Sequence, residues 1–169
     1  DTVVAPYVNA YTEGRTPNPC VECNRSIKFG RLIERADELG FDAVATGHHA
    51  RVSSSVHRFS LERGKDTAKD QSYVLYMLGQ RELSRLLLPV GEMTKADVRA
   101  RAGALGLRTA TKAESMDVCF IRAGQRVDFL DERTAPRPGW VIDVDGRRVA
   151  RHEGVAAFTA AHPDVPVYA

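Results

Sequence analysis

The stretch SIKFGRLIERADELGFDAVATGHHA (26–50) decides the fold class. Ser26 can cap a helix over residues 27–39, because its hydroxyl can accept a hydrogen bond from a backbone N–H of the first turn. The apolar positions of this helix share one stripe and a glycine ends it, namely Phe29, Leu32, Ile33, Ala36, Leu39 and Gly40. Residues 41–46 are short and β-prone and lead into the polar loop Gly47-His48-His49. A helix, a strand and a polar loop at the carboxyl end of the strand indicate an α/β sheet.

The flanking sequence predicts further elements. We expect helices over 2–12, 72–78, 81–88, 94–105 and 127–132, with Thr94 capping the helix over 94–105 and Gly106 ending it. We also expect hairpins over 50–61 (turning at Ser53–Ser55) and 140–150, and an irregular loop over 15–24. From Pro136 the β-prone hairpin pattern replaces helical patterns. We therefore expect an α/β domain over residues 1–135 and a smaller β-rich part over residues 136–169.

Composition excludes several classes of protein. The chain has 169 residues, enough for about one domain. Its net charge is +2, with 43% hydrophobic and 27% charged residues, which is typical of a globular protein and not of a disordered one. No apolar run approaches the roughly 20 residues of a membrane helix, and no signal peptide is visible. We expect a cytoplasmic protein without a membrane partner.

The three cysteines are Cys20, Cys23 and Cys119. An odd number of thiols without a leader favours a reducing compartment and reactive or metal-binding roles. Cys20 and Cys23 form a Cys-x-x-Cys pair just before the helix at 27, whose N-terminus favours a thiolate. One half of a zinc site or two inert cysteines are the alternatives, but structural zinc needs four ligands. A redox or sulfur-handling site is therefore favoured for Cys20 and Cys23. Cys119 is either a buried strand cysteine or the third cysteine of that site.

Two polar loops carry further candidate residues. In Lys69-Asp70-Gln71, lysine can meet a phosphate, glutamine can read a base edge and aspartate can cap the next helix. Gly47 permits close approach of a ligand, and His48 can contact phosphate or ribose. Taken alone, each loop is more simply read as a solvated turn. Basic residues concentrate at Arg15, Arg25, Lys28, Arg31 and Arg35, although interspersed acidic residues dilute this charge.

Together these segments resemble the bacterial tRNA-specific 2-thiouridylases. The matching stretches, in the family's order and at about its spacing, are GRTPNPCVECNRSIKF (14–29), ATGHHARV (45–52), RGKDTAKDQSYVLYML (63–78), PVGEMTKADVR (89–99), ESMDVCFI (114–121) and PGWVIDVDG (138–146). The resemblance implies the second half of an adenine-nucleotide α-hydrolase-like, Rossmann-like PP-loop domain with a helical tRNA-binding insertion over 1–135. Part of a β-rich central domain would follow over 136–169.

The family resemblance also implies a reaction. Its members use ATP with Mg to adenylate the C2 oxygen of the wobble uridine in the tRNAs for Lys, Glu and Gln, and sulfur then displaces AMP. A sulfur-relay protein or sulfide is the implied donor. Cys119 matches the cysteine that carries the persulfide, and Cys23 matches the nucleophile. The other matched positions contact the target base (Asn18, Pro19, Cys20), ATP (Gly47) or tRNA (His48, Lys69, Asp70, Gln71).

The pattern leaves the sulfur chemistry open. Some members have Asp where this chain has Cys20, and members with the present pattern have been linked to a [4Fe–4S] cluster with Cys20, Cys23 and Cys119 as ligands. The three-thiolate pattern slightly favours the cluster over the persulfide account. A zinc- or iron–sulfur-binding module that binds nucleic acid without catalysis is the alternative function.

Two segments of the family's pattern are absent from the chain. The nucleotide loop Ser-Gly-Gly-x-Asp-Ser is expected before Asp1, and the segment Gly-Gln-Arg-x-Gly-Leu is expected after Phe158-Thr159. The family's C-terminal β-barrel would follow residue 169. Backbone donors of such a loop bind phosphate, so we expect a central fragment that cannot activate uridine alone.

Overall fold

The computed structural model describes residues 2–112 and 118–165. The chain forms two compact units. One, here called the terminal unit, comprises Asp1–Pro19 and Ser115–Ala169, and the other, the central unit, comprises Cys20–Glu114. This division follows spatial contacts, so the domain boundary expected between residues 135 and 136 stays a prediction.

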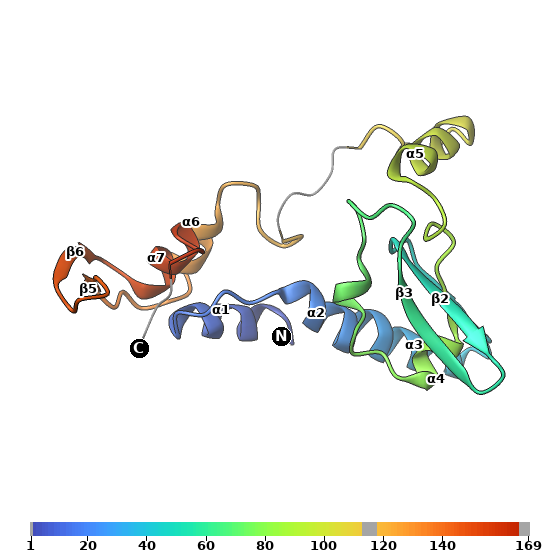
Figure 1. The fold of residues 1–169 in the computed structure, drawn as a ribbon, viewed down its shortest axis with the longest axis horizontal. Helices are drawn as coiled ribbons and strands as arrows, with labels where there is room; N and C mark the ends of the chain where they lie inside the picture. Colours follow the sequence, from blue (N-terminus) through green and yellow to red (C-terminus); the bar gives the residue numbers. More distant parts are fainter. Residues whose placement is uncertain (1, 113–117, 166–169) are drawn as a thin grey trace. The chain divides into compact units, whose positions relative to one another are not determined.

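The central unit combines a long helical run with short strands (Figure 1). Its elements are α2 (Pro19–Cys23), η1 (Asn24–Arg31, π-helical), α3 (Leu32–Glu38), β1 (Val44–Ala45), β2 (Ala50–Ser55), β3 (Arg58–Arg63), η2 (Ser72–Val74, 3-10), α4 (Gln80–Ser84), β4 (Leu86–Leu87) and α5 (Lys95–Ala104). Strand β1 pairs in parallel with β4, and β2 pairs antiparallel with β3. Parallel strands need a crossover connection, so the β1–β4 pair fits the expected α/β class.

The core of the central unit lies between the helical run and these strands. The helices bury Phe29, Ile33 and Ala36, which pack with Val44 of β1 and Leu86 of β4. The helical period had also placed Leu32 and Leu39 on the buried stripe, but these side chains are 43% and 54% exposed. They lie at the edge of the stripe, so the core is narrower than the sequence pattern predicts.

The start of the helical run differs from the prediction. Residues 15–24 were expected to form an irregular loop and Ser26 to cap the helix, but the helix already begins at Pro19. Proline suits a first helical position because its fixed φ is helical and its missing N–H has no partner there. Ser26 lies inside the run, where its hydroxyl donates to the Glu22 carboxylate.

Three further predictions are wrong in detail. Ser53–Ser55 belong to β2 and the hairpin turns after them, since Ser55 pairs with Arg58. The helix expected over 72–78 is limited to η2. The helix expected over 81–88 ends at Ser84, and Leu86–Leu87 form β4 instead. Pairing with β1 explains the last change, because the backbone N–H of Val44 donates to the Arg85 carbonyl at 2.8 Å.

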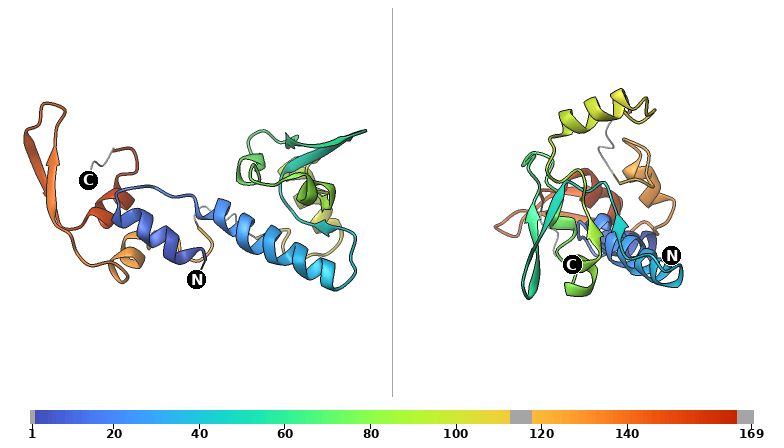
Figure 2. Two further views of the ribbon diagram at one scale, coloured as in Figure 1. Left: turned by 90° about the horizontal axis from the view of Figure 1, so that it is seen from below. Right: turned by 90° about the vertical axis from the view of Figure 1, so that its right-hand side faces the viewer.

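The terminal unit has three helices and a hairpin among its described residues. They are α1 (Val4–Thr12), α6 (Arg126–Asp131), β5 (Gly139–Ile142), β6 (Arg148–His152) and α7 (Val155–Ala161). Its core gathers around Tyr7, whose ring packs edge-on against Tyr11 and Phe120. Within this unit the β5–β6 hairpin extends away from α6 and α7 (Figure 2). The sequence predicted all these elements except α7.

Within residues 2–112 and 118–165, no helix has both the length and the apolar character that crossing a bilayer requires.

Candidate functional site

Hydrogen bonds join three predicted site segments of the central unit. The Gln71 side-chain oxygen accepts a bond from the His49 backbone N–H at 3.0 Å, and the Gln71 N–H donates to the His49 carbonyl at 2.9 Å. The Val74 N–H donates to the Gln71 carbonyl at 3.2 Å. Asn24 then donates from its side-chain amide to the Val74 carbonyl at 3.2 Å. The loop after β1, the loop before η2 and the cysteine-bearing helix are thus linked in one network.

Asn24 was not singled out by the sequence pattern. It is 1% exposed, and its side-chain oxygen has no hydrogen-bond partner in the structure. A buried acceptor without a partner costs free energy that an apolar side chain would avoid, so packing alone does not explain an asparagine here. Its position directly after Cys23 was the available signal, but its partner Val74 lies 50 residues away.

The two cysteines of the pair lie on α2, three residues apart. Residues at this spacing lie on neighbouring positions of one helix face. Cys20 is exposed and Cys23 is half-buried, and the structure shows no disulfide among the three cysteines, all of which it describes. Asn18 and Pro19 immediately precede the pair, the first exposed and the second buried.

Cys119 belongs to the terminal unit and is exposed in a turn. The alternative of a buried strand cysteine is therefore wrong, although residues 113–117 of the same predicted stretch lie outside the described residues. Among the residues that the structure describes, no three His, Cys, Asp or Glu side chains are grouped as metal ligands. The meeting of Cys119 with Cys20 and Cys23 stays a prediction.

Gly47 follows β1 and is exposed. A methyl group added at its Cα would meet no atom within 4 Å. The chain therefore leaves space beside this backbone, as the predicted contact with ATP requires.

His48, the next residue, is only 7% exposed. Its Nδ1 lies 2.9 Å from the Thr46 hydroxyl, and its ring packs against Phe29 at 5.8 Å between centroids. Burial, with a smaller contribution from the positive charge of Lys28, lowers the pKa of His48 from 6.5 to about 4. At neutral pH His48 is an uncharged imidazole, so it carries no positive charge and acts only as a hydrogen-bonding group.

The lowered pKa of His48 predicts acid sensitivity. Between pH 6.5 and 4 the unfolded chain binds a proton that the folded chain does not, so stability falls as pH drops through this window. The shift corresponds to ~3 kcal/mol, and solvent screening reduces the expected loss to about 1–2 kcal/mol. Urea denaturation at pH 7 and pH 4.5 should show a smaller pH effect in His48→Gln. His57→Gln, at the exposed β2–β3 turn, is the control, and equal pH effects in both variants would contradict this prediction.

Asp70 holds its loop together. Its carboxylate accepts bonds from the Gly64 N–H at 2.8 Å and the Ser72 hydroxyl at 2.7 Å. Slight burial raises the pKa of Asp70, but these hydrogen bonds outweigh it and hold the pKa below its ordinary value. Asp70 therefore stays ionised and fixes the loop, while neighbouring Lys69 is exposed. The Gln71 oxygen bonds to His49, so its amide N–H₂ is the part that remains to read a base.

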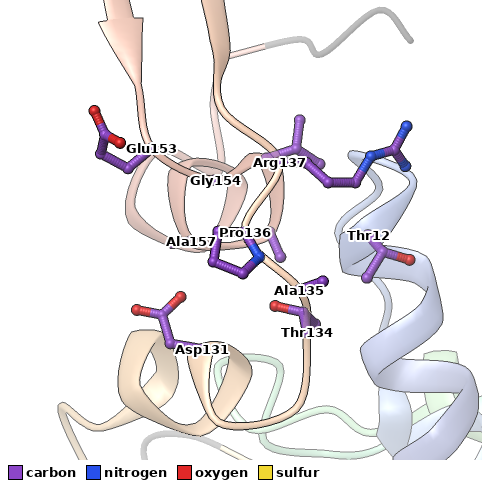
Figure 3. Close-up of a pocket in the computed structure, with 11 residues that line it drawn as sticks. Thr12, Asp131, Thr134, Ala135, Pro136, Arg137, Glu153, Gly154 and Ala157 are labelled. Atoms are coloured by element: carbon purple, nitrogen blue, oxygen red, sulfur yellow. The ribbon is translucent and has the colours of Figure 1, made fainter.

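A cavity of about 280 Å³ lies in the terminal unit, between the ends of α1 and α6 and the start of α7 (Figure 3). Its polar side chains are those of Thr12, Asp131, Thr134, Arg137 and Glu153, and the rest of its lining is mostly apolar. It contains none of the predicted site residues. The candidate site is therefore the network of the central unit and not this cavity.

The parallel β1–β4 pair is covered by a helix, which defines an α/β domain. The polar loop after β1 and the helix that carries the cysteine pair meet near the end of β1, so the candidate site lies there. The family model described as "tRNA methyl transferase HUP domain" matches residues 1–123. The chain belongs to this family. The predicted fold class and family resemblance are thereby confirmed.

Individual relatives agree with this assignment. The chain is 51% identical over 161 residues to the tRNA-specific 2-thiouridylase MnmA of Chloroflexus aggregans, an alignment that covers 93% of this chain and 45% of that protein. It is 50% identical to the protein of the same name from Beutenbergia cavernae, covering 94% and 42%. It is 52% identical to the Sorangium cellulosum protein of that name, and this alignment covers 93% of the present chain and 41% of that protein. The chain thus spans less than half the length of these relatives.

Proposed function

We propose that the protein carrying this chain is a tRNA 2-thiouridylase, which replaces the C2 oxygen of the wobble uridine with sulfur at the expense of ATP. The observation that carries the proposal is the network through Asn24, Val74 and Gln71. It holds the candidate nucleophile, the candidate RNA-binding loop and the candidate nucleotide-binding loop in one unit. The printed name of the relatives supports the same reaction.

In the proposed reaction the uridine oxygen attacks the α-phosphate of ATP, and pyrophosphate leaves. Gly47 gives the nucleotide room to approach, and neutral His48 offers the RNA a hydrogen bond. The terminal sulfur of a persulfide on Cys119 then passes to C2 as AMP leaves with the oxygen. Cys23 closes a disulfide with Cys119 in this step, and a thiol reductant restores both cysteines. The step requires Cα atoms within roughly 7 Å, so the two cysteines must lie within this distance when the disulfide forms.

The cluster account assigns the same cysteines differently. Cys20, Cys23 and Cys119 would hold a [4Fe–4S] cluster, which would supply iron as a Lewis acid for sulfide. Thiolates are the usual ligands of such clusters, and the placing of Cys20 and Cys23 on one helix face fits two of the three. In this account the sulfur atom that enters the uridine would come from sulfide, and Cys23 and Cys119 would form no disulfide.

The proposal is tested with the protein produced from its complete coding sequence. Incubation with unmodified tRNA for Lys, Mg-ATP, a thiol reductant and a sulfur source should yield 2-thiouridine and one AMP per modified base, measured by mass spectrometry of nucleosides and by nucleotide chromatography. The sulfur source is tested in two forms, sulfide and a relay protein that transfers its persulfide sulfur to Cys119. The same tRNA with cytidine at the wobble position should yield neither. Binding of tRNA and metal without thiolation under these conditions would overturn the proposal in favour of a non-catalytic binding module.

A further inference from the structure

The β5–β6 hairpin carries an aromatic ring with two guanidinium groups lying over it. Trp140 on β5 lies directly opposite Arg151 on β6. The guanidinium carbon of Arg148 lies 5.0 Å from the centroid of the Trp140 ring, and that of Arg151 lies 5.8 Å from it. Trp140 is 48% exposed, and both arginines are exposed. We call these three residues the hairpin face.

The two arginines are ordered by the ring and not by a carboxylate. Several other exposed arginines lie against acidic partners, as in the pairs Arg25–Glu22, Arg35–Glu38 and Arg81–Asp37. Within the described residues, no ion pair joins Arg148 or Arg151 to a carboxylate. A cation–π contact uses the face of the guanidinium and leaves its N–H donors available. Both groups are therefore partly ordered and remain open to an anion.

Two acidic residues, Asp143 and Asp145, lie at the adjoining turn, and within the described residues neither forms an ion pair with Arg148 or Arg151. The Asp143 carboxylate accepts the backbone N–H groups of Asp145 at 3.0 Å and of Arg147 at 2.8 Å. These bonds keep it at the turn. The hairpin face thus presents two positive charges around an apolar ring, which is the chemistry that binds phosphate groups of nucleic acids.

We propose that the hairpin face binds backbone phosphates of the tRNA substrate. The proposal rests on the proposed function for the identity of the RNA, and on charge complementarity for the contact. Guanidinium groups fit phosphate oxygens in bidentate geometry. The hairpin extends away from α6 and α7 (Figure 2), and both guanidinium groups lie over the Trp140 ring, so one nucleic-acid strand can approach the ring together with them.

The experiment uses the fluorescence of Trp140, which is the only tryptophan in the chain. The 169-residue chain is titrated with unmodified tRNA for Lys at several salt concentrations. We expect a saturable change in tryptophan emission that weakens with salt. Arg148→Gln with Arg151→Gln should lower the affinity about tenfold at low salt and reduce the slope of log affinity against log salt by about 2, because two phosphate contacts are lost.

The matched control removes the same charge elsewhere, with Arg58→Gln and Arg108→Gln, both at exposed positions. An equal loss of tRNA affinity in the two double variants would overturn the proposal, because the loss would then depend on net charge alone and not on the position of the arginines. tRNA binding without a change in Trp140 emission would also overturn it, as would equally tight binding of polyglutamate, which would point to an acidic protein partner. Such failures leave the proposed function untouched if the complete protein still forms 2-thiouridine. If tRNA binds to the hairpin face but the complete protein forms no 2-thiouridine, only the proposed function is contradicted.

Discussion

Replacing Gly91 by alanine is expected to unfold the central unit. A Cβ atom at this position would lie 1.9 Å from the carbonyl oxygen of Ala50 and 2.8 Å from its carbonyl carbon. Ala50 is fully buried at the start of β2 and is paired with Arg63, so its backbone has no room to move away. The Gly91 carbonyl is itself held by the Lys65 N–H at 2.8 Å. We expect a loss of about 3 kcal/mol or more, at the upper end of overpacking effects.

Gly103→Ala is the matched control. Gly103 lies inside α5, and an added methyl group would meet no atom within 4 Å. Alanine is favoured over glycine in a helix by roughly 1 kcal/mol, so this variant should be slightly more stable than the parent chain. Thermal denaturation followed by circular dichroism compares the two. A Gly91→Ala variant that melts with the parent would show that the turn at 89–91 lies further from β2 than described.

Cys23→Ser is expected to reduce thiolation by the complete protein by at least ~10³-fold. A serine hydroxyl is scarcely ionised at neutral pH, whereas the thiolate is both nucleophile and metal ligand. Both sulfur accounts predict this loss, so the variant tests the site and not the mechanism. Formation of 2-thiouridine is the measurement, and unchanged tRNA binding shows that the variant is folded. Activity near that of the parent would contradict the assignment of Cys23.

Cys20→Ser separates the two sulfur accounts. If Cys23 and Cys119 act through a persulfide, Cys20 is auxiliary and only part of the activity is lost. If the three cysteines hold a cluster, replacing one soft thiolate by a hydroxyl removes iron and activity together. Bound iron and 2-thiouridine are measured after reconstitution without oxygen. Full activity of parent protein shown to be free of iron would exclude the cluster, whatever the variant does.

Local signals predicted those elements that local chemistry determines. Thr94 was expected to cap a helix, and its hydroxyl accepts the Asp97 N–H at 3.1 Å while the Asp97 carboxylate accepts the Thr94 N–H at 3.0 Å. Gly40 and Gly106 were expected to end helices, and both adopt a positive φ there. Strand β4 was missed because two leucines form a strand only when Val44 lies beside them, which is tertiary information.

The candidate site likewise has parts that local sequence predicts and parts that depend on tertiary contacts. The segments around Cys23, Gly47 and Gln71 could be identified from their residues and from the family resemblance. What holds them together could not, because the bond between His49 and Gln71 spans 22 residues and that between Asn24 and Val74 spans 50. Neither has a local pattern, and the buried Asn24 contradicts the expectation that a fully buried position is apolar.

The π-helical segment Asn24–Arg31 has a consequence for comparing related sequences. It stands between the cysteines and the core residues Ile33 and Ala36, and Gly30 permits it, because a Cβ atom there would already lie 3.0 Å from the Arg25 carbonyl oxygen. A π-helical turn, with its i→i+5 hydrogen bonds, holds one residue more than an α-helical turn. A homologue with one residue fewer in this segment can therefore form an ordinary α-helix there and still present its two cysteines on nearly the same side relative to the core. An alignment of related sequences should accordingly allow a one-residue gap between the second cysteine and the core residues.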